Sequence, residues 1–144
     1  MTAKEYLGKI QIYRRAIMST QLRIEELEHQ ASGIRAITYD RDRVQVSPEN
    51  RMEDIMIRIS EQAEKMTRQI AKYHREVEKR ERQIAGMERS EYAQLLHMKY
   101  IEGMNLLDIT VAFRDADGGQ RYSYDHVKHM HGWALSAFQK KYLE

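Results

Sequence analysis

Residues 6–31 read YLGKIQIYRRAIMSTQLRIEELEHQA, and their apolar pattern predicts a long helix. Apolar or small side chains recur at alternating steps of four and three, which is the spacing of a heptad seam along one helix face. The members of this first seam are Tyr6, Ile10, Tyr13, Ile17, Thr20, Ile24, Leu27 and Ala31. Thr2 and Glu5 have capping-box spacing, so we expect a helix to begin there and to end at Gly33.

A second seam follows after a break. Residues 34–46 lack a clear helical period and are predicted to form a connector, after which Ser47 and Pro48 suit the N-cap and first position of a helix. Arg80 is the only charged member of this seam, and we interpret it as a register marker or a snorkelling side chain. The full seam is Met52, Met56, Ile59, Ala63, Met66, Ile70, Tyr73, Val77, Arg80, Ile84 and Met87.

Two heptad helices joined by one connector predict a long antiparallel coiled-coil hairpin over residues 1–88. Extra apolar residues flank the two seams, and they are more than a two-helix contact can bury. These flanking residues are Leu7, Met18, Leu22, Ile55 and Ile57. The sequence therefore predicts self-association into a homo-oligomer.

The pattern changes after Gly86. Residues 89–144 hold three short apolar stretches, each preceded by a residue able to cap a helix, namely Ser90, Asn105 and Ser123. Gly103 is expected to end the first helix, and the polar stretch 114–121 separates the second from the third. In the last helix, the side chains expected to face the core are Val127, Met130, Ala134, Leu135 and Phe138. The predicted fold class is therefore all-α, a hairpin followed by a small helix-turn-helix domain over residues 89–144.

The composition agrees with long helices that have much solvated surface. Hydrophobic residues make up 42% and charged residues 32%, with seven Gly and one Pro, and the mean hydropathy is −0.76. Helix breakers are scarce, and narrow apolar seams are favoured over one thick core. No apolar run approaches the roughly 20 residues that a membrane span needs, so we expect a soluble, cytoplasmic protein.

No arrangement of residues suggests catalysis. The absence of Cys excludes thiolate chemistry, and no Gly-rich phosphate loop or spaced Ser, His and Asp set is visible. Three histidines, His126, His129 and His131, do not share one helix face, which disfavours a metal site. Asp115 and Asp117 lack the spacing of a calcium loop and are typical of a plain turn. We expect a protein that is not an enzyme and has no cofactor.

Five stretches carry a resemblance to a known family. They are YAQLLHMKYIEG (92–103), the helix around Asp108 and Ile109, YSYDHVKHMHGWALSAF (122–138), the opening MTAKEYL, and RVQVSPENRMEDI (43–55). In these stretches the chain resembles phage sigma-factor-like regulators, the late-operon activators of the ArpU and RinA type in phages of Gram-positive bacteria. Its last third is similar to region 4 of sigma factors.

The resemblance implies a DNA-binding transcription regulator that acts in the bacterial cytoplasm, with host RNA polymerase as a possible partner. It makes the helix that starts at Ser123 the recognition helix, which enters the major groove by its N-terminal end. Lys128 and Arg121 suit phosphates, and Asp125 suits a cytosine amine. The full set of implied DNA contacts is Arg121, Ser123, Tyr124, Asp125, His126, Lys128 and His129.

Two features depart from a simple DNA-binding domain. The segment RDADGGQ, residues 114–120, stands where the family passes almost directly between its last two helices, and it acts either as a wing or to change the angle between them. Residues 89–144 contain seven basic and seven acidic side chains, so phosphate attraction needs dimerisation or tethering by polymerase. Two other functions stay open: a small terminase subunit that recognises DNA packaging sites, and a purely protein-binding helical module.

Overall fold

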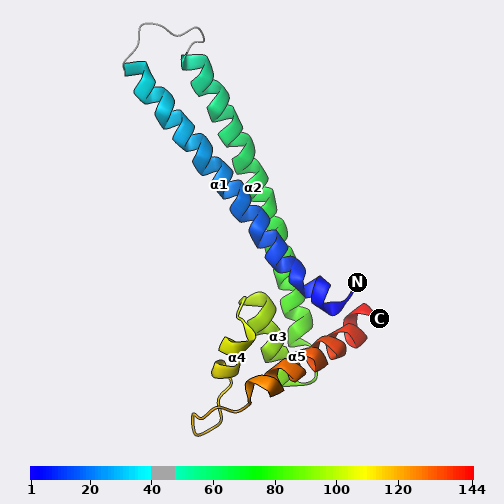
Figure 1. The fold of residues 1–144 in the computed structure, drawn as a ribbon. Helices are drawn as coiled ribbons and strands as arrows, with labels where there is room; N and C mark the ends of the chain where they lie inside the picture. Colours follow the sequence, from blue (N-terminus) through cyan, green and yellow to red (C-terminus); the bar gives the residue numbers. More distant parts are fainter. Residues whose placement is uncertain (40–47) are drawn as a thin grey trace. The chain divides into compact units, whose positions relative to one another are not determined.

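The computed structural model describes residues 1–39 and 48–144, with the side chains of residues 1–34 and 50–144. Figure 1 shows two long helices, α1 and α2, and shorter helices after them. The helices are α1 (Ala3–Tyr39), α2 (Pro48–Ala85), α3 (Ser90–Leu96), α4 (Leu106–Ala112) and α5 (Tyr124–Phe138). Two π-helical segments, η1 (His97–Ile101) and η2 (Gln139–Leu143), directly continue α3 and α5.

The predicted all-α class is confirmed for these residues. They contain no β-strand, and the only strand-like pairing among them is an isolated bridge between Arg114 and Gln120. Within the same residues, no helix combines the length and the apolar character that crossing a membrane requires.

The start of α1 follows the prediction, but its end does not. The Thr2 N–H donates to Glu5 Oε2 at 2.9 Å and the Glu5 N–H to Thr2 Oγ1 at 3.2 Å, which is the expected capping box. The prediction that Gly33 ends the helix is wrong, because α1 runs to Tyr39 and includes the first part of the predicted connector. A glycine inside a helix costs only about 1 kcal/mol relative to alanine, which a long helix tolerates. The rest of the connector, and the predicted Ser47 cap, lie outside the described residues.

The first seam is confirmed as a continuous stripe, since every member is buried or half-buried. The second seam is confirmed except at Met56 and Ala63, which are exposed. Ile55 is buried instead and packs with Leu27 and Ala31 of α1. Steps of three and then four residues lead through Ile55 as readily as steps of four and then three lead through Met56, so only the packing distinguishes them.

The chain divides into two compact units. Unit 1 comprises residues 1–12 and 73–144, and unit 2 comprises residues 13–72, so the predicted boundary between residues 88 and 89 falls inside unit 1. The core of unit 1 combines the beginning of α1 and the end of α2 with the shorter helices. It includes Leu7, Ile10, Ile84, Leu95, Ile109, Phe113, Val127 and Phe138. The start of α1 therefore serves as part of the C-terminal core.

Arg80 lies in unit 1 with only 1% of its surface exposed, so the snorkelling interpretation is wrong. Its Nε donates to the Tyr6 carbonyl oxygen at 2.9 Å, and its guanidinium carbon lies 4.0 Å from the centre of the Tyr6 ring. Its Nη1 donates to Glu76 Oε2 at 2.6 Å and to the Glu76 carbonyl oxygen at 3.1 Å. Buried charge is retained where such partners satisfy it, and here they tie α1 to α2.

Candidate nucleic-acid interface

Local capping rules position two of the three short helices. The Asn105 side chain accepts the Asp108 N–H at 2.8 Å, which confirms the predicted cap of α4. Gly103 has φ +75°, in the left-handed region that favours glycine, and it follows the end of η1 as predicted. The prediction that Ser90 caps α3 is wrong, because Ser90 is already helical and Arg89 holds the N-cap position without a side-chain hydrogen bond.

The helix predicted to read DNA begins and packs as the sequence indicates. Ser123 caps α5, with its hydroxyl accepting the His126 N–H at 3.1 Å. The side chains of the inward face are at most 3% exposed, and they are Val127, Met130, Ala134 and Phe138. Leu135 is only half-buried. This face packs α5 against α3 and α4 in the core of unit 1.

All of the predicted contact residues are exposed, and they lie at the start of α5 or just before it. They are Arg121, Ser123, Tyr124, Asp125, His126, Lys128 and His129. Arg121 lies 5.0 Å from the centre of the Tyr122 ring, and its Nη2 lies 3.8 Å from Glu91 Oε1. The Lys128 ammonium lies 5.4 Å from the centre of the Tyr124 ring. The predicted residues thus all lie at the solvent-exposed surface around the start of α5.

His129 has a defined proton position. Its Nδ1 lies 2.7 Å from the Asp125 carbonyl oxygen, one helical turn earlier. A carbonyl oxygen only accepts, so Nδ1 carries the proton in this bond. In the neutral ring, Nε2 is then an acceptor, which suits the exocyclic amine of cytosine or adenine rather than guanine O6.

Sequence reasoning missed a row of rings on the exposed side of α5. The Tyr122 ring stacks on His126 at 4.8 Å and meets the buried Phe113 edge-on at 5.3 Å. Trp133 continues the row, with ring centres 5.8 Å from His126 and 6.2 Å from His129, and it is 50% exposed. The sequence feature that indicates this row is the spacing of positions 126, 129 and 133 at steps of three and four, which places them on one helix face.

His131 has a different role from the other two histidines of α5. It is half-buried, its Nε2 lies 2.8 Å from the Tyr100 hydroxyl, and the two rings stack at 5.8 Å. Burial, together with the charges of Lys99 and Lys4, lowers the pKa of His131, while burial raises the pKa of Tyr100 to about 12. Both groups are therefore uncharged at neutral pH, and the pair fastens α5 to η1. Among the described residues, no three His, Asp or Glu side chains gather into a metal site.

The segment between α4 and α5 forms a closed turn, as predicted. The Asp115 N–H donates to the Gly119 carbonyl oxygen at 2.8 Å, and the Gly118 N–H to the Asp115 carbonyl oxygen at 2.9 Å. Asp117 Oδ1 accepts the Gly119 N–H at 3.1 Å, so this carboxylate stabilises the turn. Whether the turn acts as a wing stays a prediction.

Comparison of the chain with protein-family models, curated proteins and solved structures found no match.

Proposed function

We propose that this chain is a DNA-binding transcription regulator whose C-terminal helices act as a helix-turn-helix similar to region 4 of sigma factors. The observation that carries the proposal is the two-sided character of α5. Its first turns present polar and basic residues to solvent, while the opposite side is buried in the core. A helix held in this way fits the major groove, which is about 12 Å wide.

Each exposed residue has a role that its chemistry supports. Arg121 and Lys128 bind phosphates, and the Ser123 hydroxyl can donate to a phosphate while it caps α5. Asp125 and the acceptor nitrogen of His129 suit exocyclic amines of bases, which are donors at the floor of the groove. An arrangement that pairs phosphate anchors with base acceptors supports sequence-specific binding.

The long helices support an assembly role. We propose that α1 and α2 form a coiled-coil hairpin through which copies of the chain associate. Of the apolar flanking residues, Met18, Leu22 and Ile57 remain more than half exposed, at 63%, 59% and 51%. Leu7 and Ile55 are buried within the chain and are not available to a second copy. Two linked reading helices would offset the weak net charge of residues 89–144.

The same exposed apolar residues support a second candidate, a small terminase subunit that recognises packaging sites, because that function also joins a DNA-binding helix to an oligomerising coil. The two candidates differ in assembly and partner. A regulator is expected to be a dimer that is retained by host RNA polymerase in a pull-down, whereas a terminase subunit is expected to form a ring without binding polymerase.

The reading role of α5 is tested by replacing Lys128 and His129 together with Ala. The parent protein is first used to select duplexes from a pool with a randomised centre. We expect the double variant to lose about 1–3 kcal/mol of discrimination at the base pair that His129 contacts. The slope of log affinity against log salt concentration should also fall by about 1, because the loss of Lys128 removes one phosphate contact.

The matched control replaces the exposed α2 residues His74 and Lys79 with Ala, which removes the same residue types from another helix. This control should bind like the parent. If the Lys128 and His129 variant also binds like the parent, with its helical content intact, α5 is not the reading helix and the protein-binding alternative is favoured.

A further inference from the structure

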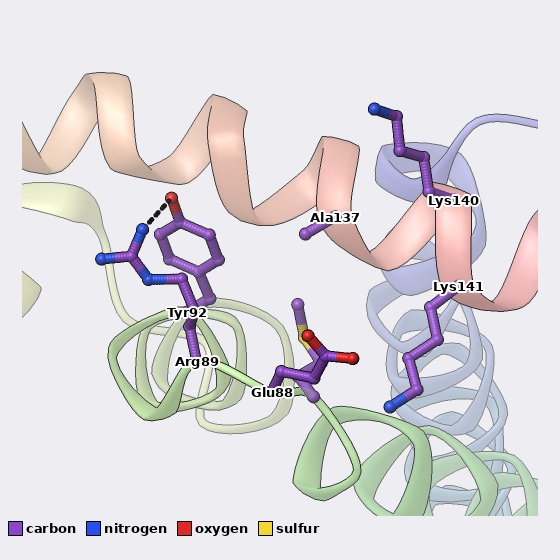
Figure 2. Close-up of a pocket in the computed structure, with 7 residues that line it drawn as sticks. Glu88, Arg89, Tyr92, Ala137, Lys140 and Lys141 are labelled. Carbon is purple, nitrogen blue, oxygen red and sulfur yellow. Dashed lines mark hydrogen bonds between the residues drawn. The ribbon is translucent and has the colours of Figure 1, made fainter.

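A cavity of about 450 Å³ lies in unit 1, and we call it the C-terminal cavity. It is bounded by the turn after α2, the start of α3, and the end of α5 with η2. Figure 2 shows Arg89 and Tyr92 on one side and Lys140 and Lys141 on the other. Its volume is in the range of ordinary ligand sites.

The C-terminal cavity concentrates positive charge that residues 89–144 otherwise lack. Three of their seven basic residues line it, and Glu88 is the single acid among the lining residues. The guanidinium of Arg89 lies 4.8 Å from the centre of the Tyr92 ring, with Nη1 3.4 Å from the Tyr92 hydroxyl. Its Nε lies 3.8 Å from Glu91 Oε2, in an exposed pair that water screens. Lys141 donates to the Gly86 carbonyl oxygen, and Lys140 is exposed. This chemistry favours an anionic partner.

The cavity continues the surface proposed to read DNA. Positions 126, 129, 133, 137 and 140 follow one another at steps of three and four, so they share one side of α5 and η2. Ala137 and Lys140 line the cavity, and Trp133 lies one turn before Ala137, in contact with His126 and His129. From His126 to Lys140 a helix rises by about 21 Å, more than the roughly 12 Å width of the major groove. A helix whose first turns occupy the groove would therefore bring Lys140 near the strand that borders it.

We propose that the C-terminal cavity is a second contact site for the same DNA and binds the sugar–phosphate backbone of the bordering strand. Lys140 and Arg89 bind phosphates, and the Tyr92 ring packs against a sugar. Glu88 opposes these contacts and limits their strength. The inference rests on the proposed function. The second site would hold the protein on DNA without recognising the base sequence.

The role of Glu88 permits a test by gain of binding, which misfolding cannot imitate. Glu88→Gln removes the opposing charge and should tighten binding to a labelled mixed-sequence duplex about two- to fivefold, the effect of one surface charge pair. Glu53→Gln is the matched control, because it removes one exposed carboxylate from α2 in unit 2. The control should leave the affinity unchanged.

Lys140→Ala tests the opposite direction. It should weaken binding to duplexes of unrelated sequence by the same factor, and it should reduce the salt slope by about 0.9, because one fewer phosphate is neutralised. Lys65→Ala removes an exposed lysine from unit 2 and should change neither quantity. Far-ultraviolet circular dichroism establishes that the variants keep their helices.

The outcomes separate this inference from the proposed function. If Glu88→Gln and Lys140→Ala bind duplexes as their controls do, while the Lys128 and His129 variant loses specificity, the C-terminal cavity is not a DNA contact and α5 still reads the groove. If the cavity variants change affinity uniformly but the Lys128 and His129 variant binds like the parent, the cavity is supported and the reading role of α5 is not. A parent chain that binds no duplex overturns both.

Discussion

Arg80 is the only charged side chain buried among the described residues. Arg80 and Arg82 each form an ion pair with the glutamate four residues earlier on α2. The Arg80–Glu76 distance is 2.6 Å and the Arg82–Glu78 distance is 3.5 Å. The Arg80 side chain is 2% exposed and the Arg82 side chain 75%. The two pairs therefore isolate the effect of burial.

We expect Arg80→Ala to lower the free energy of unfolding by about 3 kcal/mol, because it removes the bonds to Tyr6 and Glu76 and leaves a void in the core. Arg82→Ala should change it by less than about 0.5 kcal/mol, because an exposed pair is screened by water. Urea unfolding of both variants measures the difference. Equal losses would show that the contacts of Arg80 contribute no more than a surface ion pair.

His131 predicts a pH dependence of stability. Its pKa in the folded chain is lowered from the ordinary value of 6.5, and the groups that face it are Tyr100, Lys99 and Lys4. The unfolded chain therefore binds the proton more readily, so the stabilisation is complete above pH 6.5 and is lost as the pH falls below it.

Below pH 6.5, the free energy of unfolding should fall less steeply in His131→Gln than in the parent, because the contribution of His131 is gone. His74→Gln changes an exposed position and should decline like the parent. Urea unfolding across a pH series measures both. A parent and a His131→Gln variant with parallel pH profiles would count against a neutral, buried histidine at this position.

At the scale of the helices, alanine substitutions at Gly103 and Gly132 are expected to change the free energy of unfolding in opposite directions, because the two glycines have different backbone conformations. Gly103 has φ +75° after η1, and an alanine there is strained. Gly132 lies within α5, and a Cβ at that position meets no atom within 4 Å.

We expect Gly132→Ala to raise the free energy of unfolding by about 0.5–1 kcal/mol through helix propensity, and Gly103→Ala to lower it by more than about 1 kcal/mol. Thermal and urea unfolding of the two variants measure the sign. A stabilising Gly103→Ala would mean that the end of η1 tolerates a right-handed backbone.

At the scale of the whole molecule, the exposed apolar residues of unit 2 predict self-association. Leu22 and Ile57 are more than half exposed although they lie on the two long helices, and a second copy is the partner that the heptad pattern favours. We expect the full chain to sediment as a dimer or larger oligomer at micromolar concentration.

Leu22→Glu combined with Ile57→Glu should dissociate this oligomer without loss of helix. Leu107→Glu combined with Val111→Glu is the control, since these exposed apolar residues lie on α4 in unit 1, at 60% and 51% exposure. Sedimentation velocity distinguishes the cases. A parent chain that sediments as a monomer contradicts the assembly role.

Features that depend on local chemistry could be predicted from the amino-acid sequence alone. The helical class, the first seam, the capping box at Thr2 and the caps Asn105 and Ser123 follow from spacing and side-chain type within a few residues. The exposure of the residues at the start of α5 follows in the same way from the apolar period of its inward face.

Features that depend on residues far apart in the chain could not be predicted from local spacing and follow from the packing of the helices. The choice of Ile55 over Met56 depends on Leu27 and Ala31, and the burial of Arg80 depends on Tyr6. The C-terminal cavity joins the turn after α2 to η2 through the contact of Lys141 with Gly86, which lie 55 residues apart in the chain. A helical period specifies which face of an element is apolar, but the partner of that face is set by how the elements pack, because burial and charge depend on neighbours in space.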